Sequence, residues 1–263
     1  MGRWRNLTLI VSLILGMVSG CESYFQFLSM SNLWVETSDP IAELLFWESV
    51  SPEALRYWPV FFYEREALQN RIERAAPLVC LISRRGITGA SVGVDPLIPW
   101  ISARWGEKDY FVSKEGVAWE SEHELNEVLK GIKPPEGPPF DFSDEFPPPH
   151  GEDETIVAAK IVFPMDLLEG WIAGLAKNRW ITQVERINIS RREGRYLLSL
   201  SLKEGSRLLL RGELLQWDEI APALAQVMEQ LHFLGDNIII DTTYTDRIIV
   251  RSMNSGDQEG SGK

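Results

Sequence analysis

The N-terminus holds the feature that most constrains this chain, an apolar run preceded by two arginines. Arg3 and Arg5 come before Leu7 to Gly20, which contains no charged residue. Positive charge before an apolar run favours a cytoplasmic start. After the run no Lys or Arg occurs until Arg56, although several acidic residues do. The pattern predicts a cytoplasmic tail over residues 1–6, a membrane anchor over residues 7–27, and a body beyond the membrane.

Three kinds of anchor fit this segment. A spanning helix needs about 20 mostly apolar residues, so Leu7 to Gly20 must extend to Leu28 and take in Glu22. The small residues before Cys21 resemble a lipoprotein processing site, which makes Cys21 a candidate for lipidation. A cleaved secretory peptide without lipid is the third alternative.

The composition is that of a globular, acidic protein. Hydrophobic residues make up 44% of the chain and charged residues 24%, with a formal net charge of −12. An acidic body repels phosphate backbones, so we expect no nucleic-acid partner. Two cysteines are too few for a disulfide framework. Cys80 lies in an apolar run and is predicted to be a buried thiol in a strand.

The first part of the body predicts the order strand, helix, helix, strand, strand. Hydrophobic alternation places the first strand at residues 25–35. Proline and an N-capping serine mark helix starts near Pro40 and Ser51, and a longer helix is predicted over residues 64–74. Two paired strands follow at residues 78–83 and 90–94.

The second part is predicted to be mostly β, with a hairpin around residues 113–116 and further strands and two helices beyond residue 155. Between them, residues 131–154 contain seven prolines and many acidic residues. Such a composition predicts an exposed, semi-rigid loop that could be removed at little cost to stability.

Few residues point to chemistry. Gly89-Ala90-Ser91-Val92-Gly93 matches the G-x-S-x-G nucleophile elbow, but Pro96 and Pro99 follow where that motif requires a long helix. A small-residue strand is the simpler interpretation, and an exported serine hydrolase using Ser91 is a minor alternative. The histidines are scattered without metal-ligand spacing, and no phosphate-binding glycine motif occurs. We expect no catalytic residue, metal, cofactor or small-molecule substrate.

Three stretches resemble the bacterial cell-division FtsQ/DivIB family. They are Ala75-Ala76-Pro77-Leu78-Val79, followed by Asp95-Pro96-Leu97-Ile98-Pro99-Trp100, and then Tyr110-Phe111-Val112 through Gly116-Val117. Further along, Leu208-Leu209-Leu210-Arg211-Gly212 and Ile240-Asp241-Thr242-Thr243-Tyr244 are similar to strands near the family's C-terminus. Thr243 stands where the family often has Arg, and Trp217-Asp218 stands where it often has a basic residue.

The resemblance implies an α+β chain: an N-terminal membrane helix, a small POTRA-like β-α-α-β-β domain over residues 28–97, and a mixed β domain with an antiparallel sheet and flanking helices over residues 98–253. The proline-rich residues 131–154 become an insertion in the second domain, and residues 254–263 a disordered tail. Family members span the inner membrane once, which favours a retained helix and a periplasmic or extracellular body.

The resemblance also implies a non-enzymatic scaffold of the divisome, which recruits FtsB-like and FtsL-like proteins during septation. A lipid-anchored envelope-assembly protein with a POTRA-like peptide-binding domain is the alternative. An exposed closing strand can take up a partner segment through its free backbone groups. The predicted partner-binding residues are Tyr244, Thr245, Asp246, Arg247, Ile248, Ile249, Val250 and Arg251.

Overall fold

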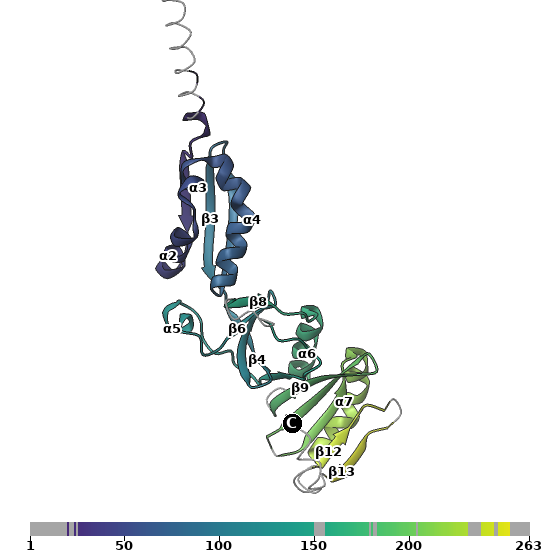
Figure 1. The fold of residues 1–263 in the computed structure, drawn as a ribbon. Helices are drawn as coiled ribbons and strands as arrows, with labels where there is room; N and C mark the ends of the chain where they lie inside the picture. The colour runs from purple at the N-terminus through teal and green to yellow at the C-terminus, as the bar shows by residue number, and fades with distance from the viewer. Residues whose placement is uncertain are drawn as a thin grey trace, which may run out of the picture. The chain divides into compact units, whose positions relative to one another are not determined.

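The computed structural model describes residues 20, 24, 26–149, 156–178, 180, 183–203, 205–230, 238–244 and 247–252. The chain divides into two compact units. The first runs up to Leu97 and includes Glu127–Lys130, and the second comprises Ile98–Asn126 and the chain from Gly131 onward. The first unit contains a three-stranded sheet and the second a ten-stranded sheet (Figure 1).

The predicted membrane anchor falls mostly outside the described residues, as do Cys21 and the predicted tails 1–6 and 254–263. In the part of the chain that the structure describes, no helix is both long enough and apolar enough to cross a membrane. This finding corrects the predicted fold class, because the described chain is a mixed α/β fold, mostly β, without a membrane helix. It corrects the predicted single-pass, inner-membrane localisation on the same ground.

The outer end of the predicted anchor belongs instead to the folded first unit. Phe27 accepts a hydrogen bond at its carbonyl oxygen from the Trp58 indole Nε1, at 3.0 Å. Ser29 forms an isolated antiparallel bridge with Tyr57. Phe27 and Ser29 thus contact the start of α4 and the residue before it in the folded first unit.

The first unit consists of one strand, three helices and two further strands. Their bounds are β1 Asn32–Glu36, α2 Pro40–Ser49, α3 Pro52–Arg56, α4 Trp58–Ala75, β2 Leu78–Arg85 and β3 Gly89–Pro96. The order differs from the predicted one by the short helix α3. The first strand also covers residues 32–36 rather than residues 25–35.

Local signals explain where these helices begin. Each has a proline in its first turn, where the fixed φ and the missing N–H do no harm. Ser51 caps α3 by accepting a hydrogen bond from the Ala54 backbone N–H at 3.1 Å. The longest helix, α4, begins six positions before Glu64, and its early turns are held by Phe61, which is fully buried.

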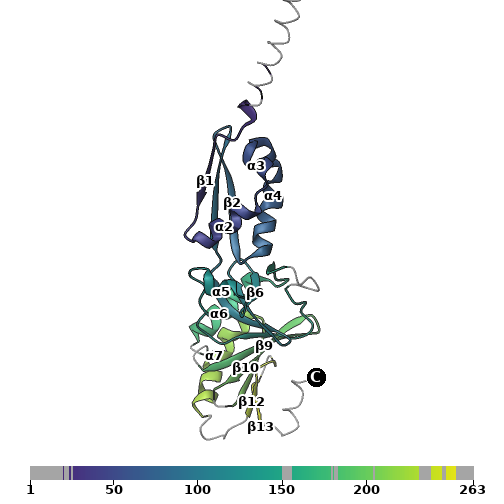
Figure 2. The ribbon, with the colours of Figure 1, turned by 60° about the vertical axis from the view of Figure 1, so that its left-hand side comes forward.

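The small sheet has the order β1-β3-β2, with β3 parallel to β1 and antiparallel to β2. Figures 1 and 2 show the helices on one face of this sheet. The other face carries exposed side chains, including Trp34 and Leu81. The core between sheet and helices contains Ala42, Phe46, Ala54, Phe61, Leu68, Ile72, Leu78, Cys80, Val92 and Val94. Burial, and after it the nearby charge of Glu73, raises the pKa of the Cys80 thiol to about 12.

Asp39 is a buried carboxylate that holds two segments of the first unit together. Its Oδ1 accepts the Ile41 N–H at 2.7 Å, and its Oδ2 accepts the Lys130 N–H. Burial by itself would raise the pKa of Asp39, but the backbone N–H groups of Lys130, Ile41 and Ala42 outweigh it, so the pKa lies below its usual range.

Removing this carboxylate should therefore cost stability in a pH-dependent way. We expect Asp39→Ala to lower the free energy of unfolding by about 1 kcal/mol at neutral pH. Because the folded pKa is lowered, the contribution is present above the unfolded value of about 3.9 and is lost as pH falls through the folded value. Thermal melts at neutral and strongly acidic pH measure the difference. Asp144→Ala, at an exposed position, is the control, and an Asp39→Ala deficit that persists unchanged in acid would contradict the explanation.

The second unit is built on a mixed sheet rather than the predicted antiparallel one. The strand order is β13-β12-β11-β10-β9-β7-β4-β5-β6-β8, and three of its pairings are parallel. After β3 the elements are β4 Pro99–Trp105, β5 Lys108–Ser113, β6 Val117–Glu120, α5 Leu125–Val128, β7 Phe140–Phe142, β8 Ala158–Lys160, α6 Met165–Lys177, β9 Val184–Arg192, β10 Arg195–Leu202, β11 Arg207–Arg211, α7 Leu214–Glu229, β12 Ile238–Asp241 and β13 Ile249–Ser252. The short helix α5 is shared, because its last two residues belong to the first unit.

The proline-rich insertion contributes a central strand of this sheet, which corrects its prediction as an exposed loop. β7 pairs parallel with β4 on one side and with β9 on the other. Phe140 and Phe142 are buried, and Phe142 stacks on Trp105 with ring centres 4.2 Å apart. The prolines flank the Phe-Asp-Phe segment without entering it, so they do not remove ladder hydrogen bonds from the strand.

Helices α6 and α7 pack on one face of the large sheet and share its core. Two buried indoles connect this layer to the end of β11. Trp171 Nε1 donates to the carbonyl oxygen of Gly212 at 2.8 Å, and Trp217 Nε1 donates to that of Arg211 at 2.7 Å. Along β9, β10 and β11, buried core residues alternate with less buried ones, and they are Ile187, Ile189, Leu198, Leu200, Leu208 and Leu210.

Candidate partner-binding site

The large sheet ends at β13, which pairs on one side only within the described chain. β13 runs antiparallel to β12, with Ile239 opposite Arg251 and Ile240 opposite Val250. β12 in turn pairs parallel with β11. The side chain of Val250 is 38% exposed. An edge strand of this kind presents backbone N–H and C=O groups that a further strand can pair with.

The connection from β12 to β13 is tied to the sheet where it starts. Thr242 donates both its backbone N–H and its hydroxyl to the carbonyl oxygen of Leu209, at 3.1 and 2.7 Å. Asp241 Oδ1 accepts the backbone N–H and the hydroxyl of Thr243, at 2.9 and 2.6 Å. These four bonds determine where the chain leaves β12 and thus where the following residues are presented.

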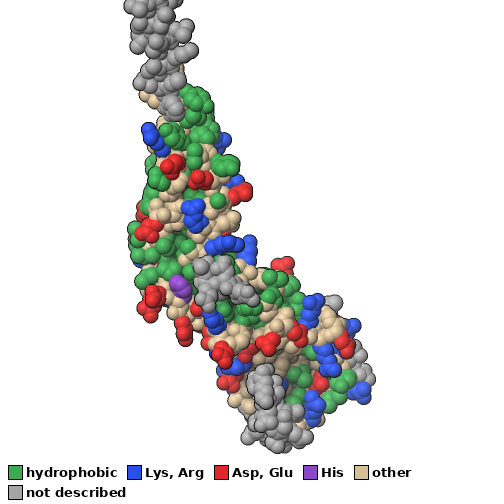
Figure 3. All heavy atoms as spheres, in the orientation of Figure 1, with side chains coloured by type: hydrophobic (Ala, Val, Ile, Leu, Met, Phe, Trp, Pro, Cys, Tyr) green, Lys and Arg blue, Asp and Glu red, His purple; other side chains and the backbone are tan. Residues whose placement is uncertain are grey.

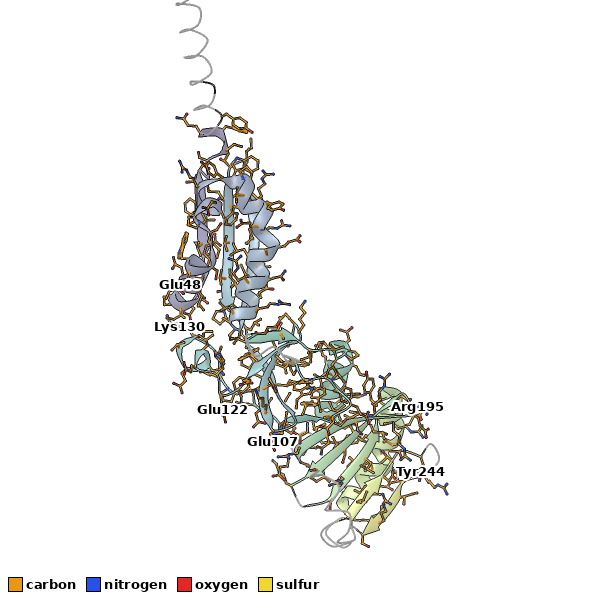
Figure 4. The ribbon with its side chains drawn as sticks, in the orientation of Figure 1. Glu48, Glu107, Glu122, Lys130, Arg195 and Tyr244 are labelled. Carbon is orange, nitrogen blue, oxygen red and sulfur yellow. The ribbon has the colours of Figure 1, made fainter. Side chains whose placement is uncertain are left out.

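A groove of about 530 Å³ lies between α7 and this connection. Apolar contacts on its lining come from Ile220, Val227 and Ile248, which are partly buried against the core. At its rim the Arg247 guanidinium lies 5.4 Å from the ring centre of Tyr244, which is 44% exposed. Figure 4 shows Tyr244 in the C-terminal part of the second unit. Tyrosine and arginine beside an apolar surface are the residue types that most often anchor protein partners.

The structure places the predicted binding residues in two adjoining features. Tyr244, Arg247 and Ile248 line the groove, whereas residues 249–251 belong to β13. Thr245 and Asp246 lie outside the described residues. The closing strand is thus shorter than predicted, because Tyr244, Arg247 and Ile248 lie outside β13 and line the groove with α7.

The helical side of the groove was not predicted from the sequence. It consists of Glu219, Ile220, Ala223, Gln226 and Val227 of α7 and of Gln230 directly after it. These positions follow the spacing of three and four residues that marks one face of a helix. That spacing identifies a face next to the buried one, but only the position of the closing segment shows that this face adjoins a binding surface.

The edge strand β2 of the small sheet, unlike β13, is covered by side chains of a helix. At Cys80 of β2, the backbone N–H donates to Glu73 Oε1 at 3.2 Å, and the carbonyl oxygen accepts from Gln69 Nε2 at 2.7 Å. Both partners come from α4 and occupy the positions of a neighbouring strand. Covering an edge in this way opposes strand addition. This part of β2 is therefore a weaker candidate for partner binding than β13.

A group of charged residues crosses the large sheet at β4, β5, β7 and β9. Arg104 donates to both carboxylate oxygens of Asp109, at 2.6 and 3.0 Å, and this hydrogen bonding holds the pKa of Asp109 below its usual range. Arg186 lies 3.3 Å from Asp141, yet burial raises the pKa of Asp141. The acids are paired with arginines, which indicates a structural role for this group.

The sequence motif for a serine nucleophile lacks its required setting. Ser91 lies inside β3, where it pairs with Trp34 of β1 and Ser83 of β2. A nucleophile elbow instead places its serine at a sharp turn between a strand and a helix. In the part of the chain that the structure describes, no group of three or more His, Cys, Asp or Glu side chains could hold a metal ion.

No protein-family model and no curated protein matches this chain. The partner-binding hypothesis therefore depends on the geometry of β13 and its groove, together with the sequence resemblance.

Proposed function

We propose that this chain is a non-enzymatic scaffold of the bacterial cell-division machinery, which recruits FtsB-like and FtsL-like proteins through β13 and the adjoining groove. The observation that carries the proposal is an open terminal strand beside an amphipathic groove, at one end of a sheet whose core is well packed. The link to cell division comes from the resemblance of the sequence to the FtsQ/DivIB family.

The strand supplies affinity that depends little on partner sequence. A partner segment in extended conformation can pair with the free backbone groups of β13 and continue the sheet. Since β13 already forms a regular antiparallel ladder with β12, its conformation is preorganised. Binding then costs little ordering of the scaffold.

The groove supplies selectivity. Ile220, Val227 and Ile248 offer apolar contact, while Glu219 and Arg247 place opposite charges on its lining. A partner segment must therefore place apolar side chains against the apolar part of the groove and matching polar groups near Glu219 and Arg247. Charges at a rim contribute more to discrimination and to association rate than to affinity.

Proline substitutions along β13 test the strand. Adjacent residues of a strand point their N–H groups to opposite sides, so Val250→Pro and Arg251→Pro remove donors on opposite edges. We expect one of the two variants to keep the wild-type melting transition but no longer bind the FtsB-like protein from the same organism. The other should lose its ladder bond to β12. Binding is measured by titration with the purified partner, and each variant is melted in parallel.

Side-chain variants test the groove. Tyr244→Ala and Arg247→Ala should each weaken binding by about 1–2 kcal/mol, the range of a binding anchor. Tyr63→Ala, at a tyrosine that is 90% exposed in the first unit, is the matched control and should bind as wild type. If every β13 and groove variant stays folded and binds both division proteins normally, the proposed site is wrong.

A further inference from the structure

One end of the first unit gathers arginine and aromatic side chains that the proposed partner site does not use. The Arg84 guanidinium lies 4.9 Å from the ring centre of Trp58 and 5.1 Å from that of Phe62. The Arg85 guanidinium lies 4.7 Å from the ring centre of Trp34. Figure 1 shows the turn between β2 and β3 at the same end as the start of α4, next to where the described chain begins.

Apolar side chains protrude at this end. Ile87, in the turn between β2 and β3, is 65% exposed, and Phe27 is 56% exposed. The Phe27 ring meets the Trp58 ring edge to face, with centres 6.5 Å apart. Figure 3 shows hydrophobic atoms on this end of the first unit, with Lys or Arg side chains beside them. Exposed apolar residues at a protruding turn need an apolar environment to gain free energy.

The arginines here lack acidic partners. Arg56, Arg84 and Arg85 form no ion pair with any residue that the structure describes. Arg84 donates one hydrogen bond to the Ile87 carbonyl oxygen at 3.2 Å, which holds the guanidinium beside the turn. A guanidinium that stacks on a ring keeps in-plane N–H donors for an oxyanion. In a chain of net charge −12, these three arginines lie at the same end of the first unit without an acidic partner.

We propose that this end of the first unit docks on the surface of an anionic phospholipid bilayer. The docking surface consists of Phe27, Trp34, Trp58, Arg84, Arg85 and Ile87. Arginine donors fit lipid phosphate oxygens, tryptophan rings favour the interface between water and acyl chains, and Ile87 and Phe27 enter the apolar boundary. The contact is peripheral and requires no helix that crosses the bilayer.

The protruding shape favours a bilayer over an acidic peptide. The docking surface is formed by the end of β2 and the turn that follows it, the beginning of α4, the segment before β1 and Trp34 of β1. A planar surface accepts such a projection. A peptide of acidic sequence would find the same arginines but would leave Ile87 in water. The two occupants therefore differ in whether residue 87 becomes desolvated, which an environment-sensitive label can report.

Vesicle flotation with the full chain tests the electrostatic part. The probes are vesicles of phosphatidylcholine alone and of phosphatidylcholine mixed with phosphatidylglycerol. Each arginine near an anionic surface is worth about a fivefold change in partitioning. We expect the double variant Arg84→Gln/Arg85→Gln to bind the mixed vesicles roughly 30-fold more weakly than wild type, with no change on phosphatidylcholine alone. All variants keep residues 1–23, so that segment contributes equally to each.

Two control variants separate charge from packing. Arg84→Lys/Arg85→Lys keeps the positive charge but removes the planar guanidinium groups that stack on the aromatic rings. This variant should bind within about twofold of wild type. Arg191→Gln/Arg192→Gln removes an adjacent arginine pair in the second unit, where Arg191 also stacks on a ring, Tyr196. This control should bind like wild type. The proposal is wrong if Arg84→Gln/Arg85→Gln binds the mixed vesicles as well as wild type does. It is also wrong if both control variants lose as much binding as Arg84→Gln/Arg85→Gln does.

A label at residue 87 tests insertion. On a Cys21→Ser background, an Ile87→Cys variant is labelled with an environment-sensitive fluorophore, while Cys80 stays unlabelled because it is buried. We expect a blue shift on the mixed vesicles and none for a label at Val162→Cys, another exposed position. An unshifted label would overturn the proposal. Arginine-dependent binding of a polyglutamate probe in place of the vesicles would assign the surface to an acidic protein partner.

Discussion

Deleting residues 134–149 should abolish folding of the second unit, although their composition is that of an exposed linker. The deletion removes β7, which lies between β4 and β9 and pairs with both. Neighbouring strands of a sheet lie about 5 Å apart. Without β7, the strands β4 and β9 are therefore separated by the width of one missing strand and lose their pairing partner. Far-UV circular dichroism and a thermal melt of the deletion variant measure the effect.

A point substitution tests the same strand more finely. Phe142 is 4% exposed, stacks on Trp105, and meets Phe146 and Phe163 edge to face. We expect Phe142→Ala to lower the free energy of unfolding by about 3–5 kcal/mol, through lost burial and the cavity it leaves. Since whole domains are stable by only about 5–15 kcal/mol, the variant should be close to unfolded at physiological temperature.

The control lies in the same insertion. Pro134→Ala changes an exposed position and should alter the free energy of unfolding by less than about 0.5 kcal/mol. Urea titrations of the two variants give the comparison. If the deletion variant or Phe142→Ala melts like wild type, β7 is not a structural strand and the insertion is a spacer after all.

Replacing Gly212 should give the second large effect, because another side chain has no room there. A Cβ built at this position would lie 2.8 Å from the Tyr196 Cβ and 2.9 Å from the Trp171 ring. Trp171 is fully buried in the core and Tyr196 packs against that core. The Trp171 indole also donates to the Gly212 carbonyl oxygen. We expect Gly212→Val to cost at least about 1–3 kcal/mol from overpacking, and about 1 kcal/mol more if the indole hydrogen bond breaks.

Gly93 provides the matched control. It lies within β3, whereas Gly212 directly follows β11, and no atom lies within 4 Å of a Cβ built at Gly93. Valine favours strands more than glycine does, so Gly93→Val should leave stability unchanged or raise it by up to about 1 kcal/mol. Thermal melts of the two variants should move in opposite directions. Equal shifts would show that strand propensity, not space around Gly212, dominates.

The candidate site was only partly within reach of sequence reasoning. The closing stretch from Tyr244 to Arg251 was singled out as an edge, and β13 is the terminal strand of the large sheet. Its division into a groove-lining segment and a shorter strand could not be predicted. That division depends on α7, which contributes five lining residues from an earlier part of the chain.

The sequence by itself determined features that depend on neighbouring residues. Pro40 and Pro52 mark helix starts because proline suits a first turn in any context. Gly86 and Gly116 turn hairpins because glycine adopts the positive φ found at both positions. Apolar and polar residues alternate in much of the sequences of β9 and β10 because one face of those strands is more buried than the other.

Only the tertiary structure decided what depends on residues far apart in the chain. β7 has three residues, too few to show a period, and its stability comes from β4 and β9. The aromatic start of α4 is helical because Phe61 enters the core. The outer end of the predicted anchor is tied to Trp58, some thirty positions later in the chain. In each case a non-local contact outweighs weak local preference, since local propensities are worth only tenths of a kcal/mol while a buried aromatic is worth several.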